Sequence, residues 1–214
     1  MAKLDRQFWG QSKVVVGVDE VGKGCLAGPV YAGAVALDAQ AFLRLKTPVR
    51  GLIRDSKTLS AAQREKARVL ILKVSLACAV GVASVAEIEQ QGIQGATESA
   101  MMRAIAALNV SIDMLLVDGK IRLKPYQGAQ MTVVDGDFLS PSIAAASILA
   151  KLERDAFMHQ QALVYQKYGF NRHVGYGTAY HIKQIEEHGI CPLHRRNFQP
   201  IKAKLMGALS TVEA

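Results

Sequence analysis

Four acidic side chains follow runs of apolar residues, at positions where strands are expected to end. Asp19 and Glu20 follow VVVGV, Asp118 follows MLLV, and Asp137 closes MTVVDGD. In an open α/β sheet, sites are built at strand ends, so acids that are distant in sequence are expected to converge there. Ionised carboxylates repel, by roughly 4 kcal/mol for two charges about 4 Å apart at an effective dielectric constant of about 20. The cluster therefore needs cations.

A carboxylate cluster without histidine or cysteine favours a hard divalent cation, Mg²⁺ or Mn²⁺. Two such ions activate a water and stabilise the leaving oxygen of an in-line displacement at phosphorus. The chain carries 26 basic and 18 acidic side chains, a formal charge of +8, which favours a polyanionic partner. We therefore expect hydrolysis of a phosphodiester backbone, with two divalent ions per site when substrate is bound.

Each acid also has a plain structural explanation. Asp-Gly is a common turn pair, which would account for Asp118, Asp135 and Asp137. Adjacent Asp19 and Glu20 point to opposite faces of a regular strand. They share one site only where the strand ends or twists, and the glycines that follow them favour such an ending.

The segment GVDEVGK at 17–23 has the spacing of a nucleotide-binding P-loop. Gly24 stands where such a loop has the Ser or Thr that binds Mg²⁺, and the two acids inside the segment would face the phosphates. A P-loop also leads into a helix, whereas the following residues indicate a strand. The sequence therefore disfavours an ATPase.

Strands and helices alternate along the chain and must position these acids. The valine-rich segments 13–18 and 28–37 are predicted as successive antiparallel strands. Ser60 and Gln63 form a capping-box pattern at the start of a helix. Ser140 followed by Pro141 marks the start of a long helix to about residue 166. Further predicted elements are strands at 74–85, 114–119 and 129–137, and helices at 94–108 and about 178–188, the first with Met101, Met102, Ile105 and Leu108 facing inward.

Length and composition indicate one large domain, or one domain with a terminal appendage. Half of the 214 residues are apolar, which is enough for a substantial core. The run 74–86 is too short to span a bilayer and no signal peptide is recognisable, so we expect a soluble, cytoplasmic protein that binds no membrane. Cys25, Cys78 and Cys191 are scattered, which argues against disulfides. Cys191 and His194 lack a second pair with zinc spacing.

A series of short motifs extends over nearly the whole chain. They are DEVGKGCLAGPV from residue 19, DSKTLS at 55–60, LLVDGK at 115–120, GDFLSPSIAAASILAKLERD at 136–155, YGFNRHVGYGTAYH at 168–181 and HRRNF at 194–198. Each motif alone is weak, but the ordered set is highly specific. In this order it resembles the ribonuclease HII family, whose opening motif is usually DExGRG.

The resemblance implies a ribonuclease H-like α/β fold, a mixed β-sheet flanked by helices with a helical C-terminal extension. Residues 1–168 are then expected to form the catalytic domain, and residues 169–214 an extension packed on it as one structural unit. The implied enzyme is an endonuclease that hydrolyses the RNA strand of RNA/DNA hybrids. It also cuts 5′ of single ribonucleotides embedded in duplex DNA, leaving a 3′-hydroxyl and a 5′-phosphate, as in ribonucleotide excision repair.

The matching acids are the four described above, which by resemblance are catalytic and bind two Mg²⁺ or Mn²⁺ ions: Asp19, Glu20, Asp118 and Asp137. Asp155 is the alternative candidate for the metal-binding role given to Asp137. It lies four residues after Lys151 on a predicted helix, a spacing that favours a surface ion pair.

The resemblance also assigns residues to the substrate. A protein that distinguishes RNA from DNA must read the 2′-hydroxyl, and glycines allow the backbone to approach a sugar closely. By resemblance this is the task of the glycine loop, residues Gly22, Lys23 and Gly24. Tyr176 is placed against the sugar of the following deoxynucleotide; taken alone it is equally well a packed aromatic. Candidate phosphate contacts, each equally well merely solvated, are Lys57, Arg195 and Arg196.

Two residues depart from the family pattern. Lys23 stands where the family usually has Arg, which keeps the charge but loses the planar fork of donors. Asp135 stands where a basic or neutral residue is common. The Asp135 carboxylate would either hold a water molecule, change the metal affinity of the site, or point away from the site with little effect. We expect the last of these.

Two alternative functions agree less well with the sequence. A non-catalytic or weakly active hybrid-binding homologue would need a damaged acid set, and all four positions are intact. The sister ribonuclease type, with broader hybrid substrates, generally carries an extra N-terminal domain, for which residues 1–12 leave no room. The expected partners are RNA/DNA hybrids and ribonucleotide-containing duplex DNA, with replication or repair proteins as candidates. Nothing in the sequence requires more than a monomer.

Overall fold

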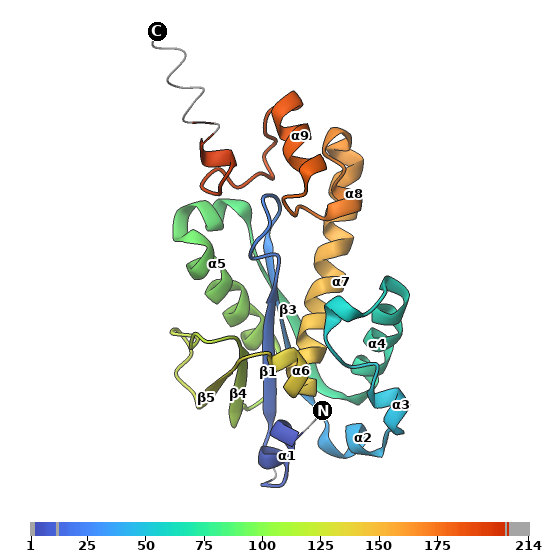
Figure 1. The fold of residues 1–214 in the computed structure, drawn as a ribbon. Helices are drawn as coiled ribbons and strands as arrows, with labels where there is room; N and C mark the ends of the chain where they lie inside the picture. The colour runs from blue at the N-terminus through green and yellow to red at the C-terminus, as the bar shows by residue number, and fades with distance from the viewer. Residues whose placement is uncertain (1–2, 12, 204, 206–214) are drawn as a thin grey trace.

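A five-stranded mixed β-sheet runs through the computed structural model, which describes residues 3–11, 13–203 and 205 (Figure 1). The strand order is β3-β2-β1-β4-β5, with antiparallel pairs on the β3 side of β1 and parallel pairs on the other side. The predicted mixed sheet is confirmed. The strands are β1 (Val15–Val21), β2 (Val30–Leu37), β3 (Ser75–Ala83), β4 (Met114–Asp118) and β5 (Gln130–Val133).

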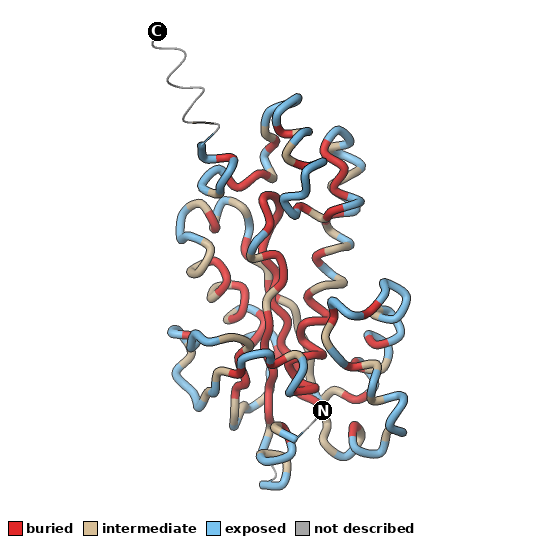
Figure 2. Tube along the Cα trace, viewed as in Figure 1, coloured by how far each residue is buried: buried red, intermediate tan, exposed pale blue. Residues whose placement is uncertain are grey.

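Helices cover both faces of the sheet. Helix α5 packs on one face, and α7 with α4 packs on the other (Figure 1). Buried residues accordingly follow the central strands and the inner sides of these helices (Figure 2). The helices are α1 (Lys3–Trp9), α2 (Ala39–Arg44), α3 (Thr47–Arg50), α4 (Ala61–Val74), α5 (Val85–Ala107), α6 (Gly136–Leu139), α7 (Pro141–Val164), α8 (Phe170–His173) and α9 (Ala179–His188), with 3₁₀ turns η1 (Ser56–Thr58) and η2 (Gln166–Tyr168).

Helix α7 lies directly on the backbone of β1 and β2. A Cβ atom added at Gly17 would lie 2.2 Å from the backbone nitrogen of Ile143, and one at Gly33 would lie 2.1 Å from the carbonyl oxygen of Ala146. No side chain other than hydrogen fits at these two positions. The helix meets the sheet with small residues of its own, and Ala144–Ala146 are fully buried. Glycine in the strands and alanine in the helix together permit this close approach.

The predicted helix starts are confirmed, with one extension. Ser60 forms the expected capping box with Gln63, and Ser140 caps α7. Helix α5 begins at Val85 rather than at residue 94, because a second capping box precedes it, and Gly92 interrupts the helix with a φ of 71°. The short helices α1, α2, α3, α6 and α8 were not predicted. The other strands and α9 lie close to the predicted ranges.

Strand β5 is shorter than predicted. It ends at Val133, and Asp135 adopts the left-handed conformation with φ 53°. Asp137 therefore lies in the first turn of α6 and not at a strand end, which corrects that part of the prediction. The side chain of Asp135 is exposed and makes no capping hydrogen bond to α6.

The C-terminal segment after η2 forms α8 and α9 and packs on the β1–β2 loop. An isolated bridge pairs Ala27 with His194, and Leu26 packs with Ile185 and Ile201. Residues 204 and 206–214 of the expected extension lie outside the described residues. The division at residue 168 stays a prediction.

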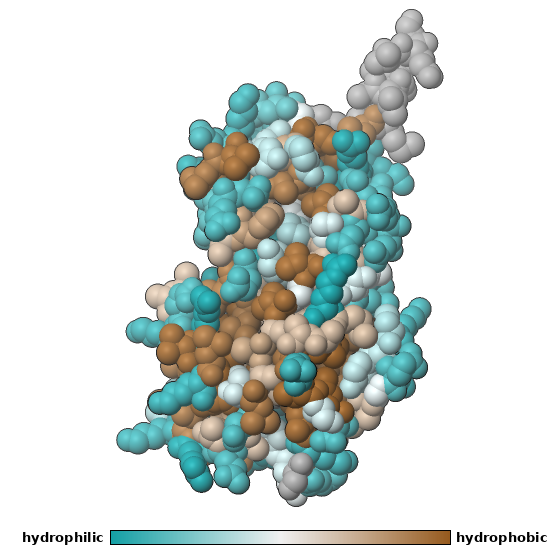
Figure 3. All heavy atoms as spheres, turned by 180° about the vertical axis from the view of Figure 1, so that it is seen from behind, coloured by the Kyte–Doolittle hydropathy of each residue, from teal (hydrophilic) through white to brown (hydrophobic). Residues whose placement is uncertain are grey.

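The remaining features of the fold concern its apolar helices, its exposed apolar side chains and its cysteines. No helix among the described residues combines the length and apolar character that a bilayer crossing requires. Seen from behind, apolar side chains gather mainly over the lower half of the molecule (Figure 3). Exposed apolar side chains on α4 and β3 include Val69, Leu72 and Leu76. All three cysteines are free thiols, and Cys25 and Cys191 are buried.

A chain of hydrogen bonds runs through the C-terminal segment, and the donor and acceptor of each bond can be assigned. Nδ1 of His181 lies 2.9 Å from the Tyr176 carbonyl, which can only accept, so this nitrogen carries the proton. Nε2 of His181 must then accept from Nε2 of His194, 3.1 Å away. This leaves Nδ1 of His194 to accept from the Cys191 N–H at 2.9 Å. Both rings are therefore neutral, and burial lowers the pKa of each to about 4.

These histidines should make stability depend on pH. Below a pH of about 6.5 they take up protons in the unfolded chain, whereas the folded pKa of about 4 keeps them neutral. The unfolded state then binds more protons, so the free energy of unfolding decreases as the pH is lowered through this window, by up to about 1.4 kcal/mol per pH unit for each histidine. Urea unfolding of wild type should show this slope between pH 7.5 and 5.

The matched variants are His194→Gln, which should reduce the slope, and His159→Gln at an exposed position of α7, which should leave it unchanged. Equal slopes in all three proteins would contradict a neutral buried pair.

Candidate active site

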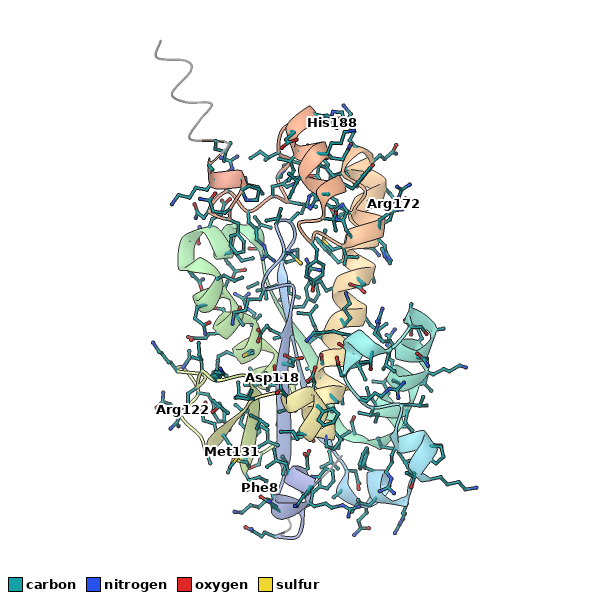
Figure 4. The ribbon with its side chains drawn as sticks, in the orientation of Figure 1. Phe8, Asp118, Arg122, Met131, Arg172 and His188 are labelled. Carbon is teal, nitrogen blue, oxygen red and sulfur yellow. The ribbon has the colours of Figure 1, made fainter. Side chains whose placement is uncertain are left out.

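The sheet brings Asp19 and Asp118 side by side. In the parallel register of β1 and β4, Val18 pairs with Val117, and the two acids are the next residues of their strands. Asp118 lies beside β1 in the middle of the molecule, whereas Arg122 lies toward the outer edge (Figure 4). The two acids lie together as predicted, but Asp19 lies inside β1, which continues to Val21, and not at a strand end.

Asp137 is brought to the same place by a backbone contact. The N–H of Gly136 donates to Oδ1 of Asp118 at 2.8 Å, which holds the first turn of α6 against the end of β4. A Cβ atom at Gly136 would lie 2.8 Å from the same oxygen, so a larger residue there would have to displace the Asp118 carboxylate. Nζ of Lys57 lies 3.9 Å from Oδ2 of Asp137. Lys57 lies in η1, where its N–H donates to the capping Asp55 at 2.9 Å.

Asp19 and Glu20 share a cavity although they are neighbours in a strand. Strand β1 continues only one residue beyond Glu20, to Val21, before the glycine loop. Asp19 is 6% exposed, and the N–H of Glu20 donates to its Oδ1 at 2.7 Å. A cavity of about 370 Å³ is lined by Asp19, Glu20, Val21, Ser56, Lys57, Arg64, Ser147, Lys151 and Tyr176.

The carboxylates carry more negative charge than their surroundings compensate. Burial, and then the charge of Asp118, raise the pKa of Asp19 well above its usual value. Burial also raises the pKa of Glu20, against the effect of Lys23 at 3.5 Å, and it raises the pKa of Asp137. Burial opposes the charged form of Lys57, but the combined charges of the nearby acids outweigh it and raise the pKa of Lys57; these acids are Asp137, Asp19, Asp55 and Asp118.

The donor set fits a hard divalent cation, because it consists of carboxylates that repel each other. Across residues 3–11, 13–203 and 205, no three acidic, histidine or cysteine side chains lie close enough to hold an ion as they stand. Lys23 and Lys57 instead approach the acids Glu20 and Asp137. A bound cation would need these carboxylates to draw together, which its charge favours.

Asp155 and Lys151 form the predicted ion pair, at 2.8 Å, but the surface location is wrong. Each side chain is 16% exposed, because α7 packs against α4 here, and Arg64 of α4 approaches Asp155 to 3.8 Å. Arg64 and Lys151 both line the cavity with Asp19. Sequence reasoning missed them as site residues; the motif around Lys151 was the only signal.

A second, smaller cavity adjoins the acids. It has about 160 Å³, and Glu20 borders both cavities. Its basic lining residues are Lys23, Lys120 and Arg122. The carboxylates thus lie between two groups of cationic side chains.

The glycine loop and Tyr176 lie next to the acids. Gly22 is buried with φ 92°, and a Cβ atom there would lie 2.1 Å from Nε of Arg154. Gly24 is exposed, and no atom lies within 4 Å of the position that its Cβ would take. Tyr176 is 42% exposed at the cavity, with Nζ of Lys151 at 5.8 Å from its ring centroid. Lys23 and Tyr176 thus line cavities that Glu20 also borders, and the roles of these residues toward a substrate stay predictions.

The two candidate arginines differ. Arg196 is exposed, as expected of a phosphate contact, and its N–H donates to Glu89 of α5 at 3.3 Å. Arg195 is 0% exposed and donates to the carbonyls of Gly22, Lys23 and Gly28. Its guanidinium is not available to a phosphate, which corrects the sequence-based role. Burial lowers the pKa of Arg195 to about 10.

The family model described as Ribonuclease HII matches residues 16–201. The chain belongs to the ribonuclease HII family. Ribonuclease HII of Prochlorococcus marinus is 48% identical, over 85% of this chain and 94% of that protein. Ribonuclease HII of Bordetella pertussis is also 48% identical, over 89% of this chain and 90% of that protein. The chain is therefore an endoribonuclease that acts on RNA/DNA hybrids.

Solved structures confirm the ribonuclease H-like fold. The ribonuclease H2 of Pyrococcus horikoshii OT3 has a TM-score of 0.74 at 23% identity, over 88% of this chain and 95% of that one. RNase HII in its complex with PCNA from Archaeoglobus fulgidus has a TM-score of 0.70 at 23% identity, over 87% and 95%. Bst-RNase HIII in complex with Mn²⁺ has a TM-score of 0.64 at 18% identity, over 92% and 70%.

The repulsion among the acids predicts a stabilising substitution. Asp118→Asn removes one negative charge beside Asp19 and keeps an oxygen for the Gly136 N–H. With a chelator present, we expect the variant to be more stable than wild type by about 1 kcal/mol, a shift of a few degrees in Tm. Thermal unfolding followed by circular dichroism measures this shift.

The control is Glu186→Gln at an exposed position of α9, which should leave the Tm unchanged. A lower Tm for Asp118→Asn under these conditions would contradict net repulsion in the cluster.

Proposed function

We propose that this ribonuclease HII cuts 5′ of single ribonucleotides embedded in duplex DNA, besides the RNA strand of hybrids, and leaves a 3′-hydroxyl and a 5′-phosphate. The supporting observation is the continuity of β1 with the glycine loop. Glu20 and Gly22 are separated by Val21 alone, so carboxylates and a sugar-reading loop adjoin one another. This arrangement suits an enzyme that cuts next to the sugar it recognises.

The four acids are proposed to hold two divalent ions, Mg²⁺ or Mn²⁺. The Bst-RNase HIII structure named above contains Mn²⁺. Two bound ions would lower the pKa of the attacking water and stabilise the departing 3′-oxygen. Asp19 and Asp118 would bind from the sheet, Glu20 from the strand end, and Asp137 from α6. The backbone N–H of Glu20 holds the carboxyl of Asp19 by a hydrogen bond of 2.7 Å.

The basic side chains around the acids are proposed to bind the phosphates of the duplex. Lys57, Arg64 and Lys151 line one cavity, and Lys23 and Arg122 the other. Contacts of this kind position a nucleic acid without reading its sequence. Arg196, which is exposed near Glu89, remains a proposed phosphate contact.

The glycine loop is proposed to read the 2′-hydroxyl, and Tyr176 to lie against the sugar of the next deoxynucleotide. The exposed position of Gly24 and the partial exposure of Tyr176 support these roles. A 2′-hydroxyl held by the loop would align the scissile phosphate with the carboxylates. Together the two contacts would recognise a junction from RNA to DNA.

The proposal also covers protein partners, oligomeric state and cellular location. The Archaeoglobus fulgidus RNase HII named above was solved with PCNA. We extend to this chain a replication or repair partner, a monomeric state and a cytoplasmic location. The weaker alternative is a homologue that binds hybrids without cutting them, and the following assay separates the two.

Purified protein should cleave a DNA duplex with one embedded ribonucleotide, on its 5′ side, when Mg²⁺ or Mn²⁺ is present. An all-DNA duplex should stay intact, and a chelator should abolish cleavage. Asp118→Asn should lose at least about 100-fold in rate, because a lost metal ligand costs more than the 10- to 100-fold typical of outer contacts. Denaturing gel electrophoresis of end-labelled strands measures these rates.

Binding without cleavage under both metals would support the non-catalytic homologue. Cleavage by Asp118→Asn at the wild-type rate would contradict the assignment of that acid.

Alanine at Gly24 should impair activity without harming the fold. Its methyl group meets no protein atom within 4 Å, but it occupies the space where the sugar would approach. We expect Gly24→Ala to unfold like wild type and to lose about tenfold or more in kcat/KM on the single-ribonucleotide duplex, the worth of about one hydrogen bond.

The contrasting variant is Gly22→Ala. Its φ of 92° and its contact with Arg154 should make this protein unstable as well as inactive. Full activity of Gly24→Ala would remove the glycine loop from substrate recognition.

A further inference from the structure

Arg195 holds the glycine loop from the inside of the protein. Its guanidinium donates to the Gly22 carbonyl at 2.7 Å, to the Lys23 carbonyl at 2.9 Å, and to the Gly28 carbonyl at 2.8 and 2.9 Å. Its own backbone N–H donates to Leu26 at 2.9 Å. The side chain is 0% exposed, so all of these contacts are made away from solvent.

These contacts orient the opposite side of the loop. A trans peptide unit is planar, and its C=O and N–H groups point in opposite directions. Because Arg195 binds the carbonyls of Gly22 and Lys23 from within, the N–H groups of Lys23 and Gly24 point away from the buried guanidinium. Among the described residues neither N–H has an acceptor, and Gly24 is exposed. Two adjacent donors are thus directed outward beside Glu20.

A second buried guanidinium fixes the rest of the β1–β2 loop. Arg154 of α7 donates to the carbonyls of Pro29 at 3.1 Å, Ala27 at 3.1 Å and Val174 at 2.9 Å. It therefore joins this loop to the segment that carries Tyr176. Within the described part of the chain, no carboxylate pairs with either guanidinium, so backbone carbonyls, together with the rings of Tyr176 and Phe198, stabilise the two charges.

Lysine could not replace Arg195 in this role. The planar guanidinium offers five N–H donors in a fixed fork, whereas an ammonium group offers three donors at one point. Three carbonyls in different directions need the fork. The matched substitution Arg195→Lys therefore keeps the positive charge and loses the geometry.

We propose that Arg195 is a positioning residue that turns the N–H groups of Lys23 and Gly24 toward the substrate, and so sets the preference for a 2′-hydroxyl. The proposal rests on the function proposed above and goes beyond it. The outward N–H groups donate to the 2′-oxygen of the ribonucleotide, and Arg195 itself touches no substrate atom. Selectivity for the sugar then depends on a residue that is buried behind the loop.

The test is equilibrium binding with a chelator present, so that no strand is cut. Wild type should bind a duplex with one ribonucleotide more tightly than the same all-DNA duplex. Arg195→Lys should lose about tenfold of this preference, since about one hydrogen bond of ordinary strength is lost, while its affinity for all-DNA duplex stays within about twofold. A merely structural role would weaken both affinities together.

The matched control is Arg172→Lys. Arg172 is exposed in the C-terminal part of the molecule, away from Asp118 (Figure 4). This variant should keep both affinities. An Arg195→Lys protein that folds and keeps the full wild-type preference would overturn the proposal.

If Arg195→Lys does not fold, the amide resonances of the wild-type protein test whether the N–H groups of Lys23 and Gly24 contact the ribonucleotide. In ¹H–¹⁵N spectra the resonances of Lys23 and Gly24 should shift with the ribonucleotide duplex and not with all-DNA duplex. The same response to both would overturn the proposal. Failure of the proposed function is recognised separately, because wild type would then leave the ribonucleotide duplex uncut with either metal.

Discussion

The direct contact of α7 with the backbone of β1 and β2 is the constraint on which the site depends. At Gly17 and Gly33 no space is left between strand and helix, so the distance at which α7 packs on the sheet is fixed. From that fixed helix, Ser147 and Lys151 line the cavity with Asp19, and Arg154 binds the β1–β2 loop. A bulkier residue in either strand would move all of these contacts at once, although neither glycine lies in the cavity.

Buried cations and exposed cations do different work in this molecule. Arg195 is shielded from solvent and bound to carbonyls, and it shapes the backbone. Lys57 is largely exposed near Asp137 and is free to respond to an incoming phosphate or metal ion. The neutral histidine pair, which ends at the Tyr176 carbonyl, adds a third kind of support. The region that is proposed to read the sugar is therefore rigid on its inner side and charged on its outer side.

Local patterns in the sequence predicted most elements and the place of three acids. Capping residues such as Ser60 marked helix starts, and the apolar runs before Asp19 and Asp118 marked the two neighbouring strands on which these acids meet. Asp137 was misplaced because the left-handed turn at Asp135 depends on tertiary packing of α6. The role of Arg195 was not predictable, because its acceptors lie about 170 positions earlier in the chain and no nearby acid signals its burial.

The short link between Glu20 and Gly22 has a consequence for the tolerance of the chain to insertions and deletions. Each strand residue advances the backbone by about 3.3 Å and turns the next side chain to the opposite face. One residue more or fewer at Val21 would displace the loop from the carboxylates and reverse the side chains beyond it. Replacement of Val21 by another apolar residue keeps the spacing. Chain length is therefore under tighter constraint here than side-chain identity.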